Sequence, residues 1–307
     1  MEVKYRLITR SDFDGLVCAV LLKEMSLIDD IKFVHPKDMQ DGLIEVTDKD
    51  ITTNLPYVPG VYMAFDHHLS ETVRNKEHKE NYIIDPDAPS AARVVYEYYG
   101  GREKFPTISE EMILAVDKAD SAQFNREDVV EPKGWELLSF LMDARTGLGR
   151  FREFRVSNYN LMMDLIDYCK DHNIDEILAL PDVKERVELY FKYTDEFKAQ
   201  ITDNATVYDN VLVVDLREEE TIYPGNRFVK YALYPDTNIS IQVIWGLKKQ
   251  NTVFTVGKSI FNRSSDVNIG EVMLSYGGGG HFNAGTCQVA NEDAERLLLE
   301  IVEKLKA

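Results

Sequence analysis

Two short stretches of the sequence each carry several metal-binding side chains directly after a strand-like apolar run. Asp12 and Asp14 follow the run Tyr5–Thr9, and the triplet Asp-His-His at positions 66–68 follows the run Val61–Phe65. Clustered carboxylates repel one another unless a cation is present. Oxygen ligands joined by one or two imidazoles favour Mn²⁺ or Mg²⁺ over Fe or Zn. If the two runs end at the same edge of one sheet, they predict a divalent metal site, with Mn²⁺ as first choice and Mg²⁺ as the alternative.

Each of these residues also has a simpler structural explanation. Asp12 and Asp14 could cap a helix that begins at Gly15, where acidic side chains suit the helix dipole. An adjacent His pair can be a chance feature of the surface. Asp117 and Asp120, three positions apart on one predicted helical face, could join the metal site or form an ordinary solvated helix end. The joint occurrence after two strand-like runs favours the metal site.

A run of four glycines, Gly277–Gly280, precedes His281 near the C-terminal end of the sequence. Successive glycines permit positive φ and allow a phosphate to approach backbone N–H groups closely. His281 would donate to that phosphate, with a charge that depends on pH near neutrality. Arg263 offers bidentate phosphate binding, although it could equally form an exposed salt bridge. A glycine-rich run alone is often a turn, but with the attached histidine this region predicts a phosphate-binding loop.

The elements that would position these residues alternate between strands and helices in the first part of the chain. Strand-like runs at 5–9, 31–34 and 61–65 are interspersed with helical patterns at 16–25, at 89–99 and from Ser109 to about 119. This alternation indicates βαβ units and a parallel sheet. In such a sheet, functional groups gather at the carboxyl ends of the strands.

The pattern changes twice along the 307 residues. Residues 135–200 are mostly helical, and the chain beyond 203 is rich in strands (207–216, 240–247, 252–261 and 286–289) and closes with a helix opened by Asn291. A chain of this length usually forms two domains. We predict an α/β protein. Its N-terminal domain (1–202) has a parallel sheet with helices on both faces and a helical connector, and its smaller C-terminal domain (203–307) is a mixed-sheet α/β domain.

The composition excludes several classes of protein. The net charge of −18 argues against broad binding of duplex DNA, which needs many Lys and Arg side chains. No run of about eighteen apolar residues and no signal-peptide pattern is present, so we expect a cytoplasmic protein without membrane segments. Cys18, Cys169 and Cys287 are far apart and odd in number, which favours buried thiols over disulfides. The oligomeric state stays open, and a homodimer is compatible with the sequence.

The motifs occur in the order seen in the DHH phosphoesterase superfamily, and the sequence resembles the branch with a C-terminal DHH-associated domain. That branch includes nano-RNases, cyclic-dinucleotide phosphodiesterases, RecJ-type exonucleases and exopolyphosphatase-like proteins. The resemblance spans nearly the whole chain and rests on the segments 12–15 (DFDG), 66–68 (DHH), 84–97, 120–124 (DSAQF), 259–264 (SIFNRS) and 277–285 (GGGGHFNAG).

The resemblance implies a role for each candidate residue. Implied ligands of two metal ions are Asp12, Asp14, His67 and Asp120. The implied catalytic pair is Asp66, which orients its neighbours, and His68, which faces the substrate or donates a proton. Implied substrate-binding residues are Arg263, Gly278, Gly279, Gly280 and His281. The reaction implied is in-line attack of a metal-activated water on phosphorus.

Two departures from the family pattern concern the first metal. Many members carry a His two or four residues before the first motif Asp, where this chain has Arg10 and Ile8. Many also carry a bridging Asp at an intermediate strand end, where the match here is Asn54, whose amide has no charge to bridge two dications. Asp48 or Asp50 would fill that position if the strand register differs.

The sequence therefore predicts a metal-dependent phosphoesterase. Its expected partner is a small phosphorylated substrate or a short single-stranded oligonucleotide. A short oligoribonucleotide or dinucleotide is favoured, with polyphosphate as another candidate. The alternative is a catalytically degenerate DHH protein that binds a nucleotide or nucleic acid without cleaving it, as the departures at 8, 10 and 54 would allow.

Overall fold

The computed structural model describes residues 4–75, 77–151 and 153–306, and the chain forms two compact units. The first unit comprises Met1–Gln123, Pro132–Ala144 and Leu148–Glu188, and the second comprises Phe124–Glu131, Arg145–Gly147 and Leu189–Ala307. The chain thus passes between the units more than once, so one boundary in the sequence cannot separate them. The division into functional domains at 202/203 stays a prediction.

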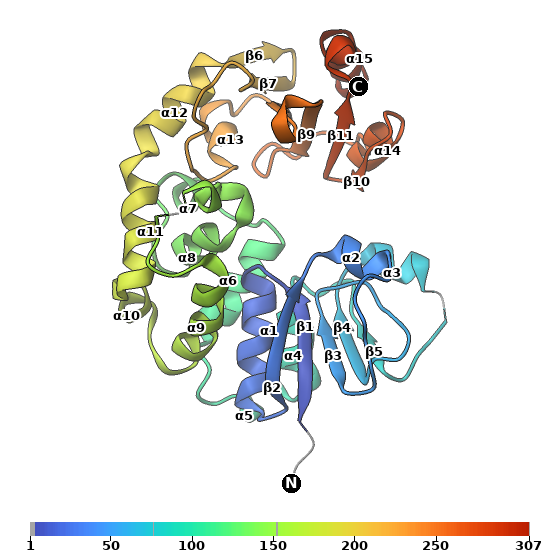
Figure 1. Ribbon diagram of the computed structural model, residues 1–307, viewed down its shortest axis with the longest axis vertical. Coiled ribbons are helices and arrows are strands. Elements are labelled where there is room, and N and C mark those ends of the chain that lie inside the picture. The colour runs from blue at the N-terminus through green and yellow to red at the C-terminus, as the bar shows by residue number, and fades with distance from the viewer. Residues whose placement is uncertain (1–3, 76, 152, 307) are drawn as a thin grey trace. The chain divides into compact units, whose positions relative to one another are not determined.

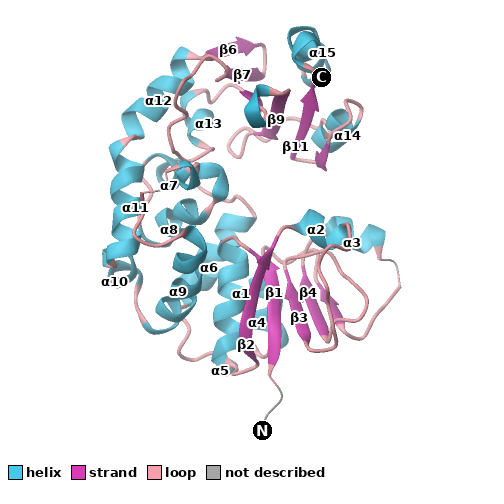
Figure 2. Ribbon diagram, viewed as in Figure 1, coloured by secondary structure: helices cyan, strands magenta, loops and turns pink. Residues whose placement is uncertain are grey.

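The first unit is built on a five-stranded sheet in which every pairing is parallel (Figures 1 and 2). Its order is β2-β1-β3-β4-β5, with β1 (Tyr5–Arg10), β2 (Ile28–Val34), β3 (Asp50–Thr53), β4 (Met63–Asp66) and β5 (Tyr82–Ile84). Because β1 lies between β2 and β3, the strand order changes direction there. The carboxyl ends of β1 and β3 therefore border the crevice where α/β sheets bind ligands.

Helix α1 (Phe13–Glu24) is buried along its first ten residues, which explains why its sequence is apolar all round. It contacts α4 (Ala91–Tyr98), α6 (Glu110–Asp120) and α9 (Asn158–Asp171). On another part of the sheet, Ile8 packs with Met39 of α2 (Pro36–Gln40) and with Leu55. The remaining helices up to the second sheet are α3 (Leu69–Arg74), α5 (Gly101–Lys104), α7 (Arg126–Val130), α8 (Gly134–Met142), α10 (Ile174–Ala179), α11 (Pro181–Lys192) and α12 (Thr194–Asp203).

The second unit contains a six-stranded sheet of order β10-β11-β9-β8-β7-β6. Its strands are β6 (Ala205–Tyr208), β7 (Val211–Asp215), β8 (Ile239–Trp245), β9 (Thr252–Lys258), β10 (Gly279–His281) and β11 (Ala284–Val289). Only the β7–β8 pairing is parallel among the pairings described, so the sheet is mixed. Apolar residues of α14 (Ile269–Leu274) and α15 (Ala294–Leu305) form a core with it, and α13 (Val229–Leu233) completes the unit.

The predicted fold class is confirmed, with local differences. The stretch 207–216, predicted as one strand, is the hairpin β6–β7, because Asp209 takes a left-handed φ of 53° and reverses the chain. Strand β3 is the intermediate strand that the family resemblance placed before Asn54, and all four of its residues are buried. The three cysteines are free and buried, as predicted.

Candidate metal centre and phosphate-binding loop

Asp14, His67 and Asp120 converge at the carboxyl edge of the parallel sheet. They come from the first turn of α1, the residue after β4 and the last residue of α6. One ligand atom from each lies within 4.8 Å of those of the other two. Two carboxylate oxygens and one imidazole nitrogen at this spacing are a donor set that suits a divalent cation.

The His67 ring is held in an orientation that suits a metal ligand. Its Nδ1 lies 3.2 Å from the carbonyl oxygen of Ala88, a contact in which Nδ1 must donate. Nε2 is therefore the ring atom that faces the cluster. This atom is buried and lies 2.9 Å from Asp120 Oδ2 and 4.0 Å from Asp14 Oδ2. A buried imidazole nitrogen held between two carboxylates fits a bound cation.

Asp14 is the most buried member of the cluster, with 2% of its surface exposed. Its carboxylate accepts hydrogen bonds from the backbone N–H groups of Ala91 (3.0 Å) and Ala92 (2.7 Å), in the first turn of α4. Burial, followed by the charge of Asp120, raises the pKa of Asp14 to about 7. The Cys18 thiol, one turn along α1, lies 3.9 Å from Asp14 Oδ1.

The charges of the cluster are coupled through the imidazole. Burial opposes protonation of His67, but its contact with Asp120 and the charge of Asp14 raise its pKa to about 9. Burial likewise opposes ionisation of Asp120, yet His67 lowers the pKa of that carboxyl. The site thus holds a positive charge between two carboxylates, and a cation that binds there takes the place of the imidazole proton.

Asp12 lies outside the three-residue cluster, and its carboxylate accepts hydrogen bonds from neighbouring groups. Its Oδ1 accepts from the backbone N–H of Gly15 (2.9 Å) and so caps α1. Arg10 Nε lies 3.0 Å from Oδ2, and Asn54 Nδ2 lies 3.2 Å from Oδ1. Both the capping role and a ligand role were open from the sequence. The cap is present, and the ligand role stays a prediction.

Asn54 directly follows β3, at the same edge as the metal ligands, as the sequence predicted. It is 1% exposed, has a left-handed φ of 55°, and leaves its Oδ1 buried without a hydrogen bond. The alternative assignment to Asp50 is wrong, because Asp50 begins β3 and pairs there with Arg6 (2.7 Å), at the amino edge of the sheet.

Asp66 and His68 form a pair beside the cluster. Asp66 is fully buried, and its Oδ1 accepts from the backbone N–H of His67 (2.9 Å) and lies 2.7 Å from His68 Nδ1. Burial opposes protonation of His68, but the Asp66 carboxylate raises its pKa. The His68 side chain is 31% exposed, so it combines a stabilised proton with access to solvent.

The glycine run of the second unit is not a plain loop, because its second half is strand β10. Gly279, Gly280 and His281 pair with Thr286, Gly285 and Ala284 of β11. A Cβ at Gly278 would lie 2.1 Å from the Thr286 carbonyl oxygen, and one at Gly280 would lie 2.3 Å from that of Ala284. Packing therefore explains two of these glycines. It does not explain Gly279, whose Cβ would meet nothing within 4 Å.

The other predicted substrate residues lie on the surface of the same unit. His281 and Arg263 are both exposed, and Arg263 Nε donates to the carbonyl oxygen of Ile260 (3.0 Å). One cation near the hairpin was missed. Lys258 ends β9, and its Nζ lies 3.5 Å from the centroid of the Phe282 ring. A lone lysine at a strand end gives no signal in the sequence.

The sequence also missed the groups that orient the ligands. These are the Ala88 carbonyl, the first amides of α4, and Arg10, which pairs with Asp12. Backbone groups carry no residue type that a sequence could reveal. Within the described residues, none of the helices combines the length and the apolar character needed to cross a membrane.

Comparison with known proteins finds a relative of high identity along the full length of the chain. The pGpG-specific phosphodiesterase PggH from Vibrio cholerae is 62% identical, with 99% of each chain covered and a TM-score of 0.87. RecJ from Thermus thermophilus, in complex with Mn²⁺, is 14% identical with a TM-score of 0.52, and covers 99% of this chain and 52% of its own; that likeness shows the fold.

Two other comparisons add little. The A-adding tRNA nucleotidyltransferase of Aquifex aeolicus is 39% identical over 91 residues, so the match spans 25% of this chain and 11% of that protein. No protein-family model matches the chain. The full-length identity, joined to the Asp14–His67–Asp120 cluster, confirms the resemblance and the prediction of an enzyme: the chain belongs to the DHH phosphoesterase superfamily and is a metal-dependent phosphoesterase.

Proposed function

We propose that this enzyme hydrolyses the phosphodiester bond of a short linear diribonucleotide, with pGpG as the first candidate. The observation that carries the proposal is 62% identity over 99% of both chains to a phosphodiesterase specific for pGpG. The sequence had favoured a short oligoribonucleotide or dinucleotide for an independent reason, the pairing of a metal site with a phosphate-binding loop.

The divalent metal would be held by Asp14, His67 and Asp120. When bound, it supplies charge that lowers the pKa of water and neutralises the phosphate. Mn²⁺ is our first candidate and Mg²⁺ the second, because oxygen ligands dominate the set. Asp12 would join as a ligand once Arg10 releases its Oδ2; until then the Arg10 guanidinium provides the positive charge beside that carboxylate.

His68 is the proposed proton donor to the leaving oxygen, and Asp66 holds its ring through Nδ1. With Nδ1 facing the carboxylate, Nε2 is the atom that transfers the proton. In the second unit, Gly278, Gly279, Gly280 and His281 would bind the phosphate that is not cleaved, with Arg263 as a further cation. Gly279 supports this role, because packing gives no reason for glycine there.

The test is turnover of a panel with Mn²⁺ or Mg²⁺: pGpG, pApA, cyclic di-GMP, 3′-phosphoadenosine phosphate and polyphosphate. We expect pGpG to give GMP, with the highest kcat/KM of the panel. If polyphosphate is the one compound hydrolysed, the substrate is a polyphosphate and not a dinucleotide. Tight binding without turnover of any compound would establish the alternative, a nucleotide-binding protein that has lost catalysis.

A further inference from the structure

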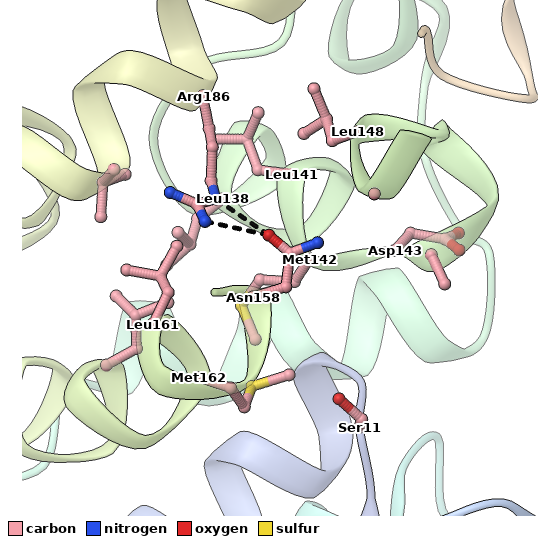
Figure 3. Close-up of a pocket in the computed structure, with 14 residues that line it drawn as sticks. Ser11, Leu138, Leu141, Met142, Asp143, Leu148, Asn158, Leu161, Met162 and Arg186 are labelled. Atoms are coloured by element: carbon pink, nitrogen blue, oxygen red, sulfur yellow. Dashed lines mark hydrogen bonds between the residues drawn. The ribbon is translucent and has the colours of Figure 1, made fainter. Parts of the chain in front are cut away.

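A cavity of about 160 Å³ lies in the first unit between α8, α9 and α11 (Figure 3). Half of the residues that line it are leucines and methionines from α8, α9 and the turn between them: Leu138, Leu141, Met142, Leu148, Leu161, Met162 and Leu165. An apolar cavity of about 150 Å³ is large enough to bind benzene. This cavity therefore has room for one aromatic ring.

One polar group in the wall is fixed in orientation. Arg186, 1% exposed, donates from Nη2 (3.0 Å) and Nε (3.2 Å) to Asn158 Oδ1. The same guanidinium also donates to the carbonyl oxygens of Val156 (2.8 Å) and Asp182 (2.6 Å). Because Arg186 has donors and no acceptor, the Asn158 amide cannot flip, and its Nδ2 points away from Arg186 (Figure 3).

The fixed amide nitrogen lies beside Gly149, another residue of the wall. A Cβ built on Gly149 would lie 3.5 Å from Asn158 Nδ2, which is an ordinary van der Waals contact. Asn158 itself is exposed, so a ligand larger than one ring can extend outward past it. The cavity thus combines an apolar floor with one N–H donor near its opening.

The cavity also adjoins the loop that carries metal ligands. Ser11 lines it, and Ser11 precedes Asp14 by three residues. Three residues of extended chain span at most about 11 Å. A nucleotide bridges a distance of that order between its base and its phosphate.

We propose that this cavity binds a nucleobase of the substrate and that Asn158 Nδ2 selects guanine, whose O6 is a carbonyl acceptor, over adenine, which carries an amino group at the same position. The inference rests on the proposed function for the identity of the substrate. The selectivity follows from the fixed donor: a carbonyl oxygen accepts from it, whereas an exocyclic amino group would place two donors face to face.

The test replaces the N–H donor of Asn158 by a hydrogen-bond acceptor. Asn158→Asp keeps an oxygen for Arg186 and replaces Nδ2 by an acceptor. Asp is also favoured in the first turn of α9, so the helix should persist. Asn160→Asp, two residues along the same helix and exposed, adds the same charge and is the matched control. We expect the ratio of kcat/KM for pGpG to that for pApA to fall at least tenfold in Asn158→Asp and to stay unchanged in Asn160→Asp.

Binding of GMP and AMP, measured by calorimetry on the same three proteins with Mg²⁺, separates this inference from the proposed function. If the wild-type enzyme hydrolyses none of the dinucleotides but binds GMP more tightly than AMP, and Asn158→Asp reverses that order, the inference stands and the function fails. A second outcome would overturn the inference: hydrolysis occurs, but Asn158→Asp changes neither the kcat/KM ratio of pGpG to pApA nor the affinity ratio of GMP to AMP. The cavity would then not distinguish the bases. Gly149→Leu, which fills the cavity, should then also leave the KM for pGpG unchanged, whereas our proposal expects it to rise at least tenfold.

Discussion

The metal centre is built from side chains, whereas the glycine hairpin is built from backbone. At the metal centre, three side chains from distant parts of the sequence meet, and backbone groups orient two of them. In the hairpin, the backbone itself is exposed, and side chains have to be absent. A site made of side chains depends on the whole parallel sheet, whereas a site made of backbone depends on one pair of strands. Substitutions should therefore have large effects in the first region and graded effects in the second.

The largest effect is expected from Asp14→Asn. The amide cannot supply a charged ligand, and it also places a donor against the N–H groups of Ala91 and Ala92. We expect kcat/KM to fall at least about 1,000-fold, equivalent to about 4 kcal/mol, and the metal content measured by mass spectrometry to be lost.

Asp12→Asn is the matched comparison for this experiment. Its carboxylate is bound by Arg10 and Asn54, so we expect the metal of the Asp14 cluster to remain. If both substitutions remove the same amount of metal, Asp12 is a ligand of equal rank, as the family resemblance implied.

Asp50→Asn tests how much the Arg6–Asp50 pair stabilises the sheet that carries the metal centre. Burial alone would raise the pKa of Asp50, but Arg6 and the Thr47 amide lower it below its ordinary value. A lowered pKa means that the stabilisation is present above about pH 4 and is lost as the pH falls through the folded-state value. We expect the variant to lose about 2 kcal/mol of unfolding free energy at pH 7.

Urea unfolding at pH 7 and at pH 3 measures this loss. The difference between the wild type and the variant should shrink at the lower pH, while metal affinity at pH 7 and 25 °C stays normal because the fold is still populated. A difference that does not depend on pH would mean that the Arg6–Asp50 pair contributes nothing through its charge.

The smallest effect is expected from Gly279→Val. A Cβ at this position meets no atom within 4 Å, so we expect the unit to keep its stability. It would cover backbone N–H groups, and we expect the KM for pGpG to rise about tenfold, equivalent to about 1.4 kcal/mol, with metal content unchanged.

Thr206→Val, on the exposed edge strand β6 at the other side of the same sheet, is the control for an added valine. If both variants bind pGpG like the wild type, the glycine hairpin is a turn and not a binding site.

The sequence predicted the frame of the metal centre well because strand ends carry its ligands. Asp14 and His67 follow apolar runs, and Asp120 ends a helix whose Ser109 cap was recognised. The residue pattern alone could not separate Asp117, which accepts from Ser90 (2.7 Å), from Asp120, which faces His67, because both lie on one helical face. The family resemblance is what selected Asp120.

The glycine run was harder to interpret from sequence. Four identical residues gave no reason to separate Gly278 and Gly280, which β11 requires, from Gly279, which it does not. The cavity beside Ser11 left no signal at all, because leucine and methionine at helical spacing are the ordinary pattern of a core.

The reactivity of the Cys18 thiol can report on motions of the catalytic region. Burial raises the pKa of its thiol, so in the closed protein it should resist alkylation. Because the sulfur contacts Asp14, we expect an alkylating reagent to reach it only when the residues packed around that carboxylate move apart. The alkylation rate of Cys18 would therefore measure how often the catalytic region opens in the absence of substrate.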